Sequence, residues 1–404
     1  MKYKDVPFGK IPINWGVARI SEVTELVTDY VANGSFSSLA KNVKYKDEED
    51  VGVLIRLVDY NNDFKGNFVF IDEHAYQFLG KTKLHGGEII ISNVGANVGT
   101  VFRCPYLPYK MSLAPNSIMV RFKENDDFYY FWLKSRAGQH MLHSIVTGSA
   151  QPKFNKTNFR KMLVPVPPKD QQNKIVSILQ PLEKKIEENK KINKNLEEQA
   201  WSVFSKYYDA AESQSKFTAL IDVLGGGTPK TNTPDFWNGS IPFFTPKDVG
   251  MPYTFHTEKH LTKAGLEHCN SKLYPKNTTF VTARGTVGKI SLAGIPMAMN
   301  QSCYALISKK INPILVYFYV HKAVNSLKHK ASGAVFDAIV TRDFDTETLN
   351  VLDKNDSRTV LSVIEPIMGA IHTNSENNIY LSNLKNYLIP KLMSGDIDVS
   401  NIDL

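Results

Sequence analysis

The chain has 404 residues, of which 42% are hydrophobic, and this is enough to build two cores of ordinary domain size. Its 48 basic and 40 acidic residues give a net charge of +8, which suits a polyanionic partner and equally an ordinary basic protein. The three cysteines lack a C-x-x-C pair, no apolar run reaches the roughly 20 residues that span a bilayer, and no secretory signal is visible. We therefore expect a soluble cytoplasmic protein without a disulfide framework or a zinc site.

Residues 1–168 are predicted to form a mixed α/β domain. Short apolar runs of strand length, rich in β-branched residues, recur along it at 51–58, 68–71, 88–92 and 117–122. A single helix is expected over 127–144, with its aromatic residues in the core. The prolines at 165, 167 and 168 end the domain, because each lacks an N–H donor and holds its predecessor extended.

A long helix is predicted for residues 169–209. From Ile175 to Tyr207 apolar residues recur at alternating spacings of four and three, and only Asn189 and Asn193 break the stripe near its middle. A 3.5-residue repeat places one apolar stripe along a helix, which must then be buried against another helix.

The second half repeats this order. A domain is expected over 210–352, with strands at 241–244, 279–282 and 302–307 and a helix at 313–330. A second long helix follows at 353–395, and residues 396–404 form a tail. The stripe returns 185 residues after its first copy, so that Asn374 and Asn378 take the places of Asn189 and Asn193, and Lys385 interrupts it.

The repeat extends beyond the helices. A glycine-bearing turn at 93–99 follows the strand at 88–92, and a similar turn at 283–288 follows the strand at 279–282. The segment 57–59 corresponds to 246–248, at the same offset as Gly99 and Gly288. The repeat is too long for a solenoid. The predicted fold is therefore α+β: two globular mixed α/β domains separated by two long antiparallel coiled-coil helices, with a pseudo-twofold internal duplication.

The four asparagines predict the register of the helix pair. In an antiparallel arrangement Asn189 faces Asn378 and Asn193 faces Asn374, so that the four amides meet in one central layer. A shifted register would leave these amides against aliphatic side chains. Asparagine at core positions lowers stability but specifies register.

Motifs of catalytic chemistry are missing. The segment 225–231 resembles a phosphate loop superficially, but Pro229 removes a backbone N–H that a phosphate would need. There is no G-x-G-x-x-G cofactor cradle, no tetrapeptide of the N-P-P-F type for gripping a flipped base, and no H-E-x-x-H spacing. We therefore assign no catalytic, cofactor-binding or metal-binding residue.

Several segments carry a family resemblance. The segments 171–176, 186–197 and 206–208 resemble the conserved helix of specificity subunits of type I restriction-modification systems. The segments 226–229 and 236–242 are similar to the opening of their target recognition domains, 147–152 and 331–335 to a loop near the end of those domains, and 388–395 to their carboxyl terminus. Each motif alone is weak, but their order and duplication are specific. The first domain departs from the pattern because it lacks the G-G-T-P opening.

The resemblance implies a non-catalytic subunit that recognises DNA sequence. Each target recognition domain would read one part of a split, asymmetric double-stranded site. The paired helices would hold the domains at a fixed separation and bind two methyltransferase subunits, which motor-nuclease subunits join. No cofactor is expected in this chain, because S-adenosylmethionine, ATP and Mg²⁺ would belong to the partner subunits.

Candidate DNA contacts lie in the loops. Base edges are read best by Arg, Lys, Asn and Gln, and phosphates by Lys, Arg, Ser and Thr. For each residue an ordinary turn or surface role is the competing interpretation. The candidates are Asn97, Lys110, Ser149, Gln151 and Lys153 in the first domain, and Lys230, Thr231, Lys247, Arg284, Thr286 and Arg342 in the second.

Two other classes of protein remain as alternatives. A self-sufficient DNA methyltransferase or nuclease is disfavoured because cofactor and carboxylate motifs are missing. A coiled-coil scaffold without a DNA role is disfavoured by the basic charge and by the two divergent globular domains.

Overall fold

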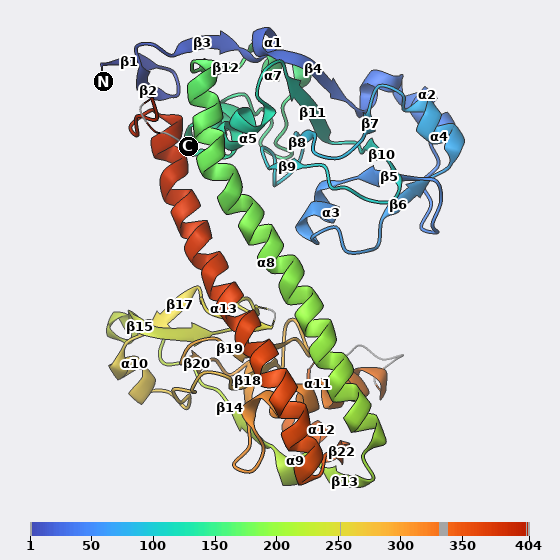
Figure 1. The fold of residues 1–404 in the computed structure, drawn as a ribbon, viewed down its shortest axis with the longest axis vertical. Coiled ribbons are helices and arrows are strands. Elements are labelled where there is room, and N and C mark those ends of the chain that lie inside the picture. The colour runs from blue at the N-terminus through green and yellow to red at the C-terminus, as the bar shows by residue number, and fades with distance from the viewer. Residues whose placement is uncertain (1, 251, 331–337, 401, 403–404) are drawn as a thin grey trace. The chain divides into compact units, whose positions relative to one another are not determined.

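The computed structural model describes residues 2–250, 252–330, 338–400 and 402. Contacts within the chain divide it into two compact units, Met1–Lys184 with Leu381–Leu404 and Lys185–Tyr380. Two long helices, α8 (Lys169–Ala210) and α13 (Lys354–Met393), contribute to both units (Figure 1). Each unit therefore consists of one α/β domain and segments of both helices.

Two four-stranded sheets frame the first unit, in the orders β6-β5-β10-β7 and β4-β11-β8-β9. Two separate pairs, β1-β2 and β3-β12, accompany them. The strands are β1 (Tyr3–Val6), β2 (Gly9–Pro12), β3 (Gly16–Arg19), β4 (Thr24–Asp29), β5 (Gly52–Ile55), β6 (Val69–Ile71), β7 (Lys83–Leu84), β8 (Ile89–Ser92), β9 (Val101–Arg103), β10 (Lys110–Leu113), β11 (Ser117–Phe122) and β12 (Leu163–Val166).

The helices of the first unit's domain are short. They are α1 (Ile20–Val23), the 3₁₀ helix η1 (Tyr30–Asn33), α2 (Phe36–Asn42), α3 (Leu57–Asn61), α4 (Glu73–Phe78), α5 (Asp126–Lys134), α6 (Arg136–Ser144) and α7 (Lys156–Lys161).

The expectation of a single helix over 127–144 is wrong, because the helix is interrupted at Ser135. The Ser135 backbone is extended, and its hydroxyl accepts a hydrogen bond from the Gly138 N–H at 3.1 Å, which caps the start of α6. A Cβ atom at Gly138 would lie 2.1 Å from the Trp132 carbonyl oxygen. The close approach of the two helices therefore requires glycine at this position.

The second unit has a five-stranded sheet, β14-β21-β18-β19-β16, a three-stranded sheet, β17-β15-β20, and the pair β13-β22. The strands are β13 (Ser213–Lys216), β14 (Asp222–Gly225), β15 (Trp237–Phe244), β16 (Tyr253–Thr254), β17 (Lys259–Leu261), β18 (Thr279–Thr282), β19 (Ile290–Ala293), β20 (Ala298–Met299), β21 (Cys303–Ile307) and β22 (Thr348–Val351). The helices of its domain are α9 (Phe217–Leu220), the 3₁₀ helix η2 (Pro234–Phe236), α10 (Lys263–Glu267), α11 (Pro313–Lys330) and α12 (Thr341–Asp345).

Strand pairing repeats between the units, which confirms the internal duplication. In the first, β5 pairs in parallel with β10, and β11 lies antiparallel between β4 and β8. In the second, β15 pairs in parallel with β20, and β21 lies antiparallel between β14 and β18. The two parallel ladders end at equivalent places, with the pairs Ile55–Leu113 and Phe244–Met299.

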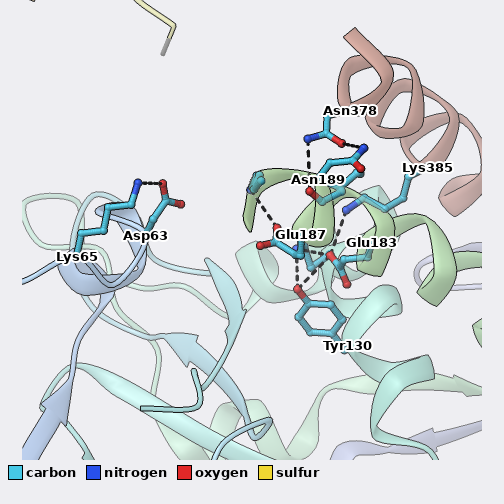
Figure 2. A network of polar contacts seen from close by, with 11 residues as sticks. Asp63, Lys65, Tyr130, Glu183, Glu187, Asn189, Asn378 and Lys385 are labelled. Atoms are coloured by element: carbon cyan, nitrogen blue, oxygen red, sulfur yellow. Dashed lines mark hydrogen bonds and ion pairs between the residues drawn. The ribbon is translucent and has the colours of Figure 1, made fainter. Parts of the chain in front are cut away.

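Within the second unit, α8 and α13 have the register that the asparagines predict. The Asn189 amide donates a hydrogen bond to the Asn378 side-chain oxygen at 2.8 Å (Figure 2). The Asn374 amide donates to the Asn193 side-chain oxygen at 2.9 Å. The antiparallel pairing of the helices and both asparagine pairs are therefore confirmed.

Within the first unit, Lys385 interrupts the stripe because it has a charged partner. Its Nζ atom lies 3.1 Å from a carboxylate oxygen of Glu183 on α8 (Figure 2). Lys134 of α5 lies 3.7 Å from the same carboxylate, and its Nζ atom donates to the Tyr130 hydroxyl at 2.9 Å. Glu183 and Lys385 are 24% and 15% exposed, so their ion pair is largely shielded from water.

Each unit buries its own core. In the first, the aromatic face of α5 packs with Ile175 and Leu179 of α8 and with Leu392 of α13. In the second, α11 packs with Phe204 of α8 and Ile364 of α13. Among the described residues, no helix is both long enough and apolar enough to cross a bilayer.

Candidate nucleic-acid interface

Three loops of the first unit meet at one place. The Asn93 N–H donates to the Asn116 carbonyl at 3.0 Å, and the Gly95 N–H donates to the Pro152 carbonyl at 2.9 Å. Gly95 and Gly99 adopt φ angles of +100° and +91°, which favour glycine. We call these loops, 93–100, 114–117 and 147–153, together with Arg56 and the first turn of α3 at 57–59, the first loop cluster. It contains four candidate DNA contacts, all exposed: Asn97, Ser149, Gln151 and Lys153.

Lys110 lies apart from the other candidates. It begins β10, whereas the opposite end of that strand leads into the loop at 114–117. Its Nζ atom is 2.7 Å from Glu73 and lies over the Tyr76 ring at 5.4 Å. The structure therefore does not bring Lys110 into the first loop cluster.

The second unit has an equivalent arrangement. The Ala283 N–H donates to the Ser302 carbonyl at 2.8 Å, and the Ile339 N–H donates to the Ala283 carbonyl at 2.9 Å. The Thr286 hydroxyl donates to the Pro246 carbonyl at 3.4 Å. We call the segments 245–248, 283–288, 300–302 and 338–339 the second loop cluster. It brings together three candidates: Lys247, Arg284 and Thr286.

The remaining candidates of the second domain lie on other segments. Lys230 and Thr231 are exposed in the loop after β14, where the Trp237 indole N–H donates to the Lys230 carbonyl at 3.1 Å. Arg342 is exposed on the short helix α12. The motif noted at 331–335 lies outside the described residues.

A cavity opens in each loop cluster. The one in the first unit has a volume of about 410 Å³, and residues of the β5–α3 turn, of β8 and its following loop, and of the β10–β11 turn line it. The one in the second unit has a volume of about 490 Å³, and the turns after β15, β18 and β20 line it. A further cavity of about 640 Å³ in the first unit adjoins the first loop cluster and includes the exposed aromatic residues Phe36 and Tyr45.

Charges differ between the two loop-cluster cavities. Lys247, Lys259 and Arg284 line the second, opposed by Glu258 alone. In the first, the charged residue of the lining is Arg56, and its other walls include Leu57, Val58 and Val94. The second cavity is therefore strongly cationic, whereas the first is mainly apolar.

Arg56 is held in place by a buried carboxylate. Its Nε atom lies 3.0 Å from one oxygen of Asp59 and its Nη2 atom 2.6 Å from the other. Asp59 is 2% exposed, and this hydrogen-bonded pairing raises the pKa of the Arg56 guanidinium. Arg56 and Lys259 line the cavities but are not among the candidates that the sequence predicts. The only sequence signal for Arg56 is that it directly precedes the repeated segment 57–59.

The family known as the type I restriction modification DNA specificity domain matches this chain twice, over residues 12–198 and 214–380. The chain belongs to that family. Its two matched regions fall on the two repeats that the strand pairings reveal.

Relatives of this specificity-domain chain carry corresponding names. The specificity subunit of the type I restriction enzyme MjaIX from Methanocaldococcus jannaschii is 30% identical over 127 residues, which are 30% of this chain and 29% of that protein. The HindI specificity subunit from Haemophilus influenzae is 19% identical over 82% of this chain and 84% of its own length. The chain thus aligns with less than a third of the first relative and with most of the second.

The fold agrees with a solved structure of the same family. The crystal structure of the type I restriction-modification S subunit from M. genitalium superposes with a TM-score of 0.59 over 96% of this chain and 99% of that chain, at 12% identity. At that identity the likeness concerns the fold alone.

No cluster of three or more His, Cys, Asp or Glu side chains that could hold a metal ion occurs among the described residues. Burial raises the pKa of the Cys104 and Cys303 thiols, so both are protonated at neutral pH and are poor nucleophiles. Polar and cationic side chains in the loop clusters suit contacts with base edges and phosphates instead.

Proposed function

We propose that this chain is the DNA sequence-recognition subunit of a type I restriction-modification complex and that it has no catalytic role of its own. The observation that carries this proposal is the double match to a DNA specificity domain. It is supported by two loop clusters with the same backbone frame and different side chains, because two different readers on one chain suit two different half-sites.

Each domain would read one half of a split double-stranded site. Residues 1–168 and 210–352 serve as the two target recognition domains. The proposed contacts in the first half-site are Asn97, Ser149, Gln151 and Lys153, with Lys110 available only if it leaves Glu73. Those in the second half-site are Lys230, Thr231, Lys247, Arg284, Thr286 and Arg342. Exposed loop residues of these types match the donors and acceptors of base edges and phosphates.

The long helices would bind the partners. We assign two methyltransferase subunits to the helices α8 and α13, with motor-nuclease subunits joining that core. S-adenosylmethionine, ATP and Mg²⁺ then act on the partner subunits. The asparagine pairs support this role indirectly, because a helix pair of specified register presents the same surface to a partner in every molecule.

Reconstitution tests this function. The chain is co-expressed with type I methyltransferase subunits, and methylated positions are mapped genome-wide. We expect methylation at one motif made of two short defined blocks and an undefined gap, and no such methylation when this chain is omitted. The purified chain alone should neither methylate nor cleave DNA when S-adenosylmethionine, ATP and Mg²⁺ are supplied.

Salt dependence provides a second test. Binding to duplex DNA should weaken steeply as salt rises, because each neutralised phosphate releases counterions. Turnover by the isolated chain would favour a self-sufficient enzyme, and salt-independent association without sequence preference would favour a scaffold.

A further inference from the structure

The two loop-cluster cavities occupy the same place in the repeated fold. The first lies at the end of the parallel pair β5–β10, next to the loop that follows β8. The second lies at the end of the parallel pair β15–β20, next to the loop that follows β18. The Arg56 N–H donates to Asp59 at 2.9 Å, and the Thr245 N–H donates to Asp248 at 2.8 Å. Arg56 and Thr245 are therefore equivalent positions of the two cavity linings.

A second pair of equivalent positions follows from the backbone bridges. Val94 forms a β-bridge with Lys153, and Arg284 forms the same kind of bridge with Ala338. Each cavity thus has one arginine, but on different loops: the first has Arg56 together with Val94, and the second has Thr245 together with Arg284. The two cavities thus share their place in the repeated fold, but the arginine lies on a different wall in each.

The donors of both arginines suit a base edge. Arg56 uses Nε and Nη2 for Asp59 and the Asn67 carbonyl, so that Nη1 retains two N–H donors. The Arg284 side chain makes no hydrogen bond or ion pair with the part of the chain that the structure describes. Guanine presents two acceptors, O6 and N7, in the major groove, and arginine is the side chain that most often reads them.

The places of the two arginines favour contact with a base edge over contact with a phosphate. Phosphate contact needs only an exposed flexible cation, whereas the Arg56 side chain is 30% exposed and is oriented by a buried carboxylate. The Arg284 side chain is exposed and has no such carboxylate, so its assignment to a base edge rests on its place in the wall of the equivalent cavity. Because the Arg56 guanidinium is already held, it loses little conformational entropy on binding, and the two N–H donors of Nη1 discriminate by geometry. Lys247 and Lys259 can supply the phosphate contacts in the second unit.

We propose that Arg56 and Arg284 each recognise the acceptor edge of one guanine, Arg56 in the half-site of the first domain and Arg284 in that of the second. This inference rests on the proposed function. It assigns one specificity-determining residue to each half-site, and it predicts a G·C pair within each block of the target.

The test measures sequence preference of the full chain assembled with its methyltransferase subunits. Duplexes carrying each base at every target position are compared for the wild type, Arg56→Ala and Arg284→Ala. Each variant should lose about ten-fold or more of its discrimination for guanine at one position of its own half-site. Preferences in the other half-site should not change, which provides an internal check that the variant is folded.

Substituted DNA sharpens the test. Replacing that guanine by 7-deazaguanine removes the N7 acceptor, so it should weaken binding by the wild type but not by the matching alanine variant. Arg56→Lys should behave like Arg56→Ala, because it keeps the charge but loses the planar guanidinium that Asp59 orients toward the cavity. It also keeps a cation near the Asp59 carboxylate if Arg56→Ala proves unstable. Arg121→Ala on β11 and Lys309→Ala after β21, both exposed and outside the cavities, are the charge-matched controls.

Three results would overturn the inference. One is a half-site without any G·C pair, and another is unchanged preference in both arginine variants. The third is equal weakening on all sequences together with a smaller salt slope, which would identify the arginines as phosphate contacts. If the wild type itself shows no sequence preference, the proposed function fails instead.

Discussion

The surface at which each domain packs on the long helices differs between the two units. In the first, α5 presents Tyr130 and Lys134 to Glu183 of α8 and Lys385 of α13. In the second, α11 presents Tyr317 and His321 at the same spacing of four residues. The repeat offset of 185 residues places Met368 and Ala200 where the first unit has Glu183 and Lys385.

At these two helix positions the polar groups have partners in the first unit and none in the described part of the second. The Tyr130 hydroxyl accepts from Lys134 and lies 3.5 Å from Glu183. The Tyr317 hydroxyl and the His321 Nε2 atom are buried and have no hydrogen-bond partner among the described residues. Trp201 packs against His321 instead, with ring centroids 5.1 Å apart. A repeated backbone frame therefore accepts either a charged cluster or an aromatic one, as it accepts different cavity walls.

Lengthening the connection between α8 and β13 is the most drastic way to test whether the halves act independently. Residues inserted at 211–212 lie outside the β13–β22 pairing, so both domains should keep their folds. We expect both half-sites to keep their bases while the gap between them changes, as measured by methylation mapping with partner subunits. The same insertion in the exposed turn at 63–65 should leave the gap unaltered, and a change of bases in either half-site would contradict independence.

Acidification should lower the stability of the protein through His321, whose buried Nε2 atom has no hydrogen-bond partner among the described residues. Burial lowers the pKa of His321 to about 4, below its ordinary value of 6.5. Between these values the unfolded chain binds more protons than the folded one, so the free energy of unfolding should fall as pH drops from 6.5 to 4, by up to about 1.4 kcal/mol per pH unit. Denaturant unfolding across this range measures the slope. His321→Phe should flatten it, and an unchanged slope in that variant would assign the pH dependence to another group.

Removing one asparagine of a pair should cost more than removing both. Asn189→Leu leaves the Asn378 side-chain oxygen without its donor in a partly buried layer, and we expect a loss of about 1–3 kcal/mol in the free energy of unfolding. The double variant with Asn378→Leu should recover most of that loss, because two aliphatic side chains pack together but specify register less well. Urea unfolding measures both, with Asn383→Leu on the exposed face of α13 as the control. Additive losses would show that the two amides do not interact.

In the charged cluster of Lys134, Glu183 and Lys385, single substitutions should lower the free energy of unfolding by less than in the asparagine layer. Glu183→Ala removes the common partner of Lys134 and Lys385, whereas Lys385→Met leaves Glu183 paired with Lys134. Because these groups are partly exposed, we expect about 1 kcal/mol for Glu183→Ala and less for Lys385→Met. Thermal unfolding of both variants and of the double variant tests the order. A larger loss in Lys385→Met would contradict it.

Periodic features of this fold could be predicted from the sequence, and contacts between distant segments could not. The alternating spacing of four and three predicts the paired helices, and Asn189 and Asn378 predict their register because core amides need each other. The partner of Lys385 was missed because Glu183 lies one residue off the stripe. No spacing rule reveals that Glu73 holds Lys110, since the two are 37 residues apart.

The candidate site shows the same limit. Glycine-bearing turns mark the loops that meet in each cluster, so that Lys247, Arg284 and Thr286 could be selected as neighbours. Arg56 could not, because it is the last residue before α3 and its orientation depends on a carboxylate three residues later. Sequence patterns thus locate the loops, and the fold decides which side chains line a cavity.

Exchange of one domain tests most directly the claim that each half reads its own half-site. Residues 217–350 are replaced by the equivalent domain of a relative with a different target, and methylation is mapped genome-wide with the partner subunits present. We predict that one block of the motif changes to that of the relative while the other block remains. If the exchange altered both blocks together, or neither, the two-reader account would be wrong.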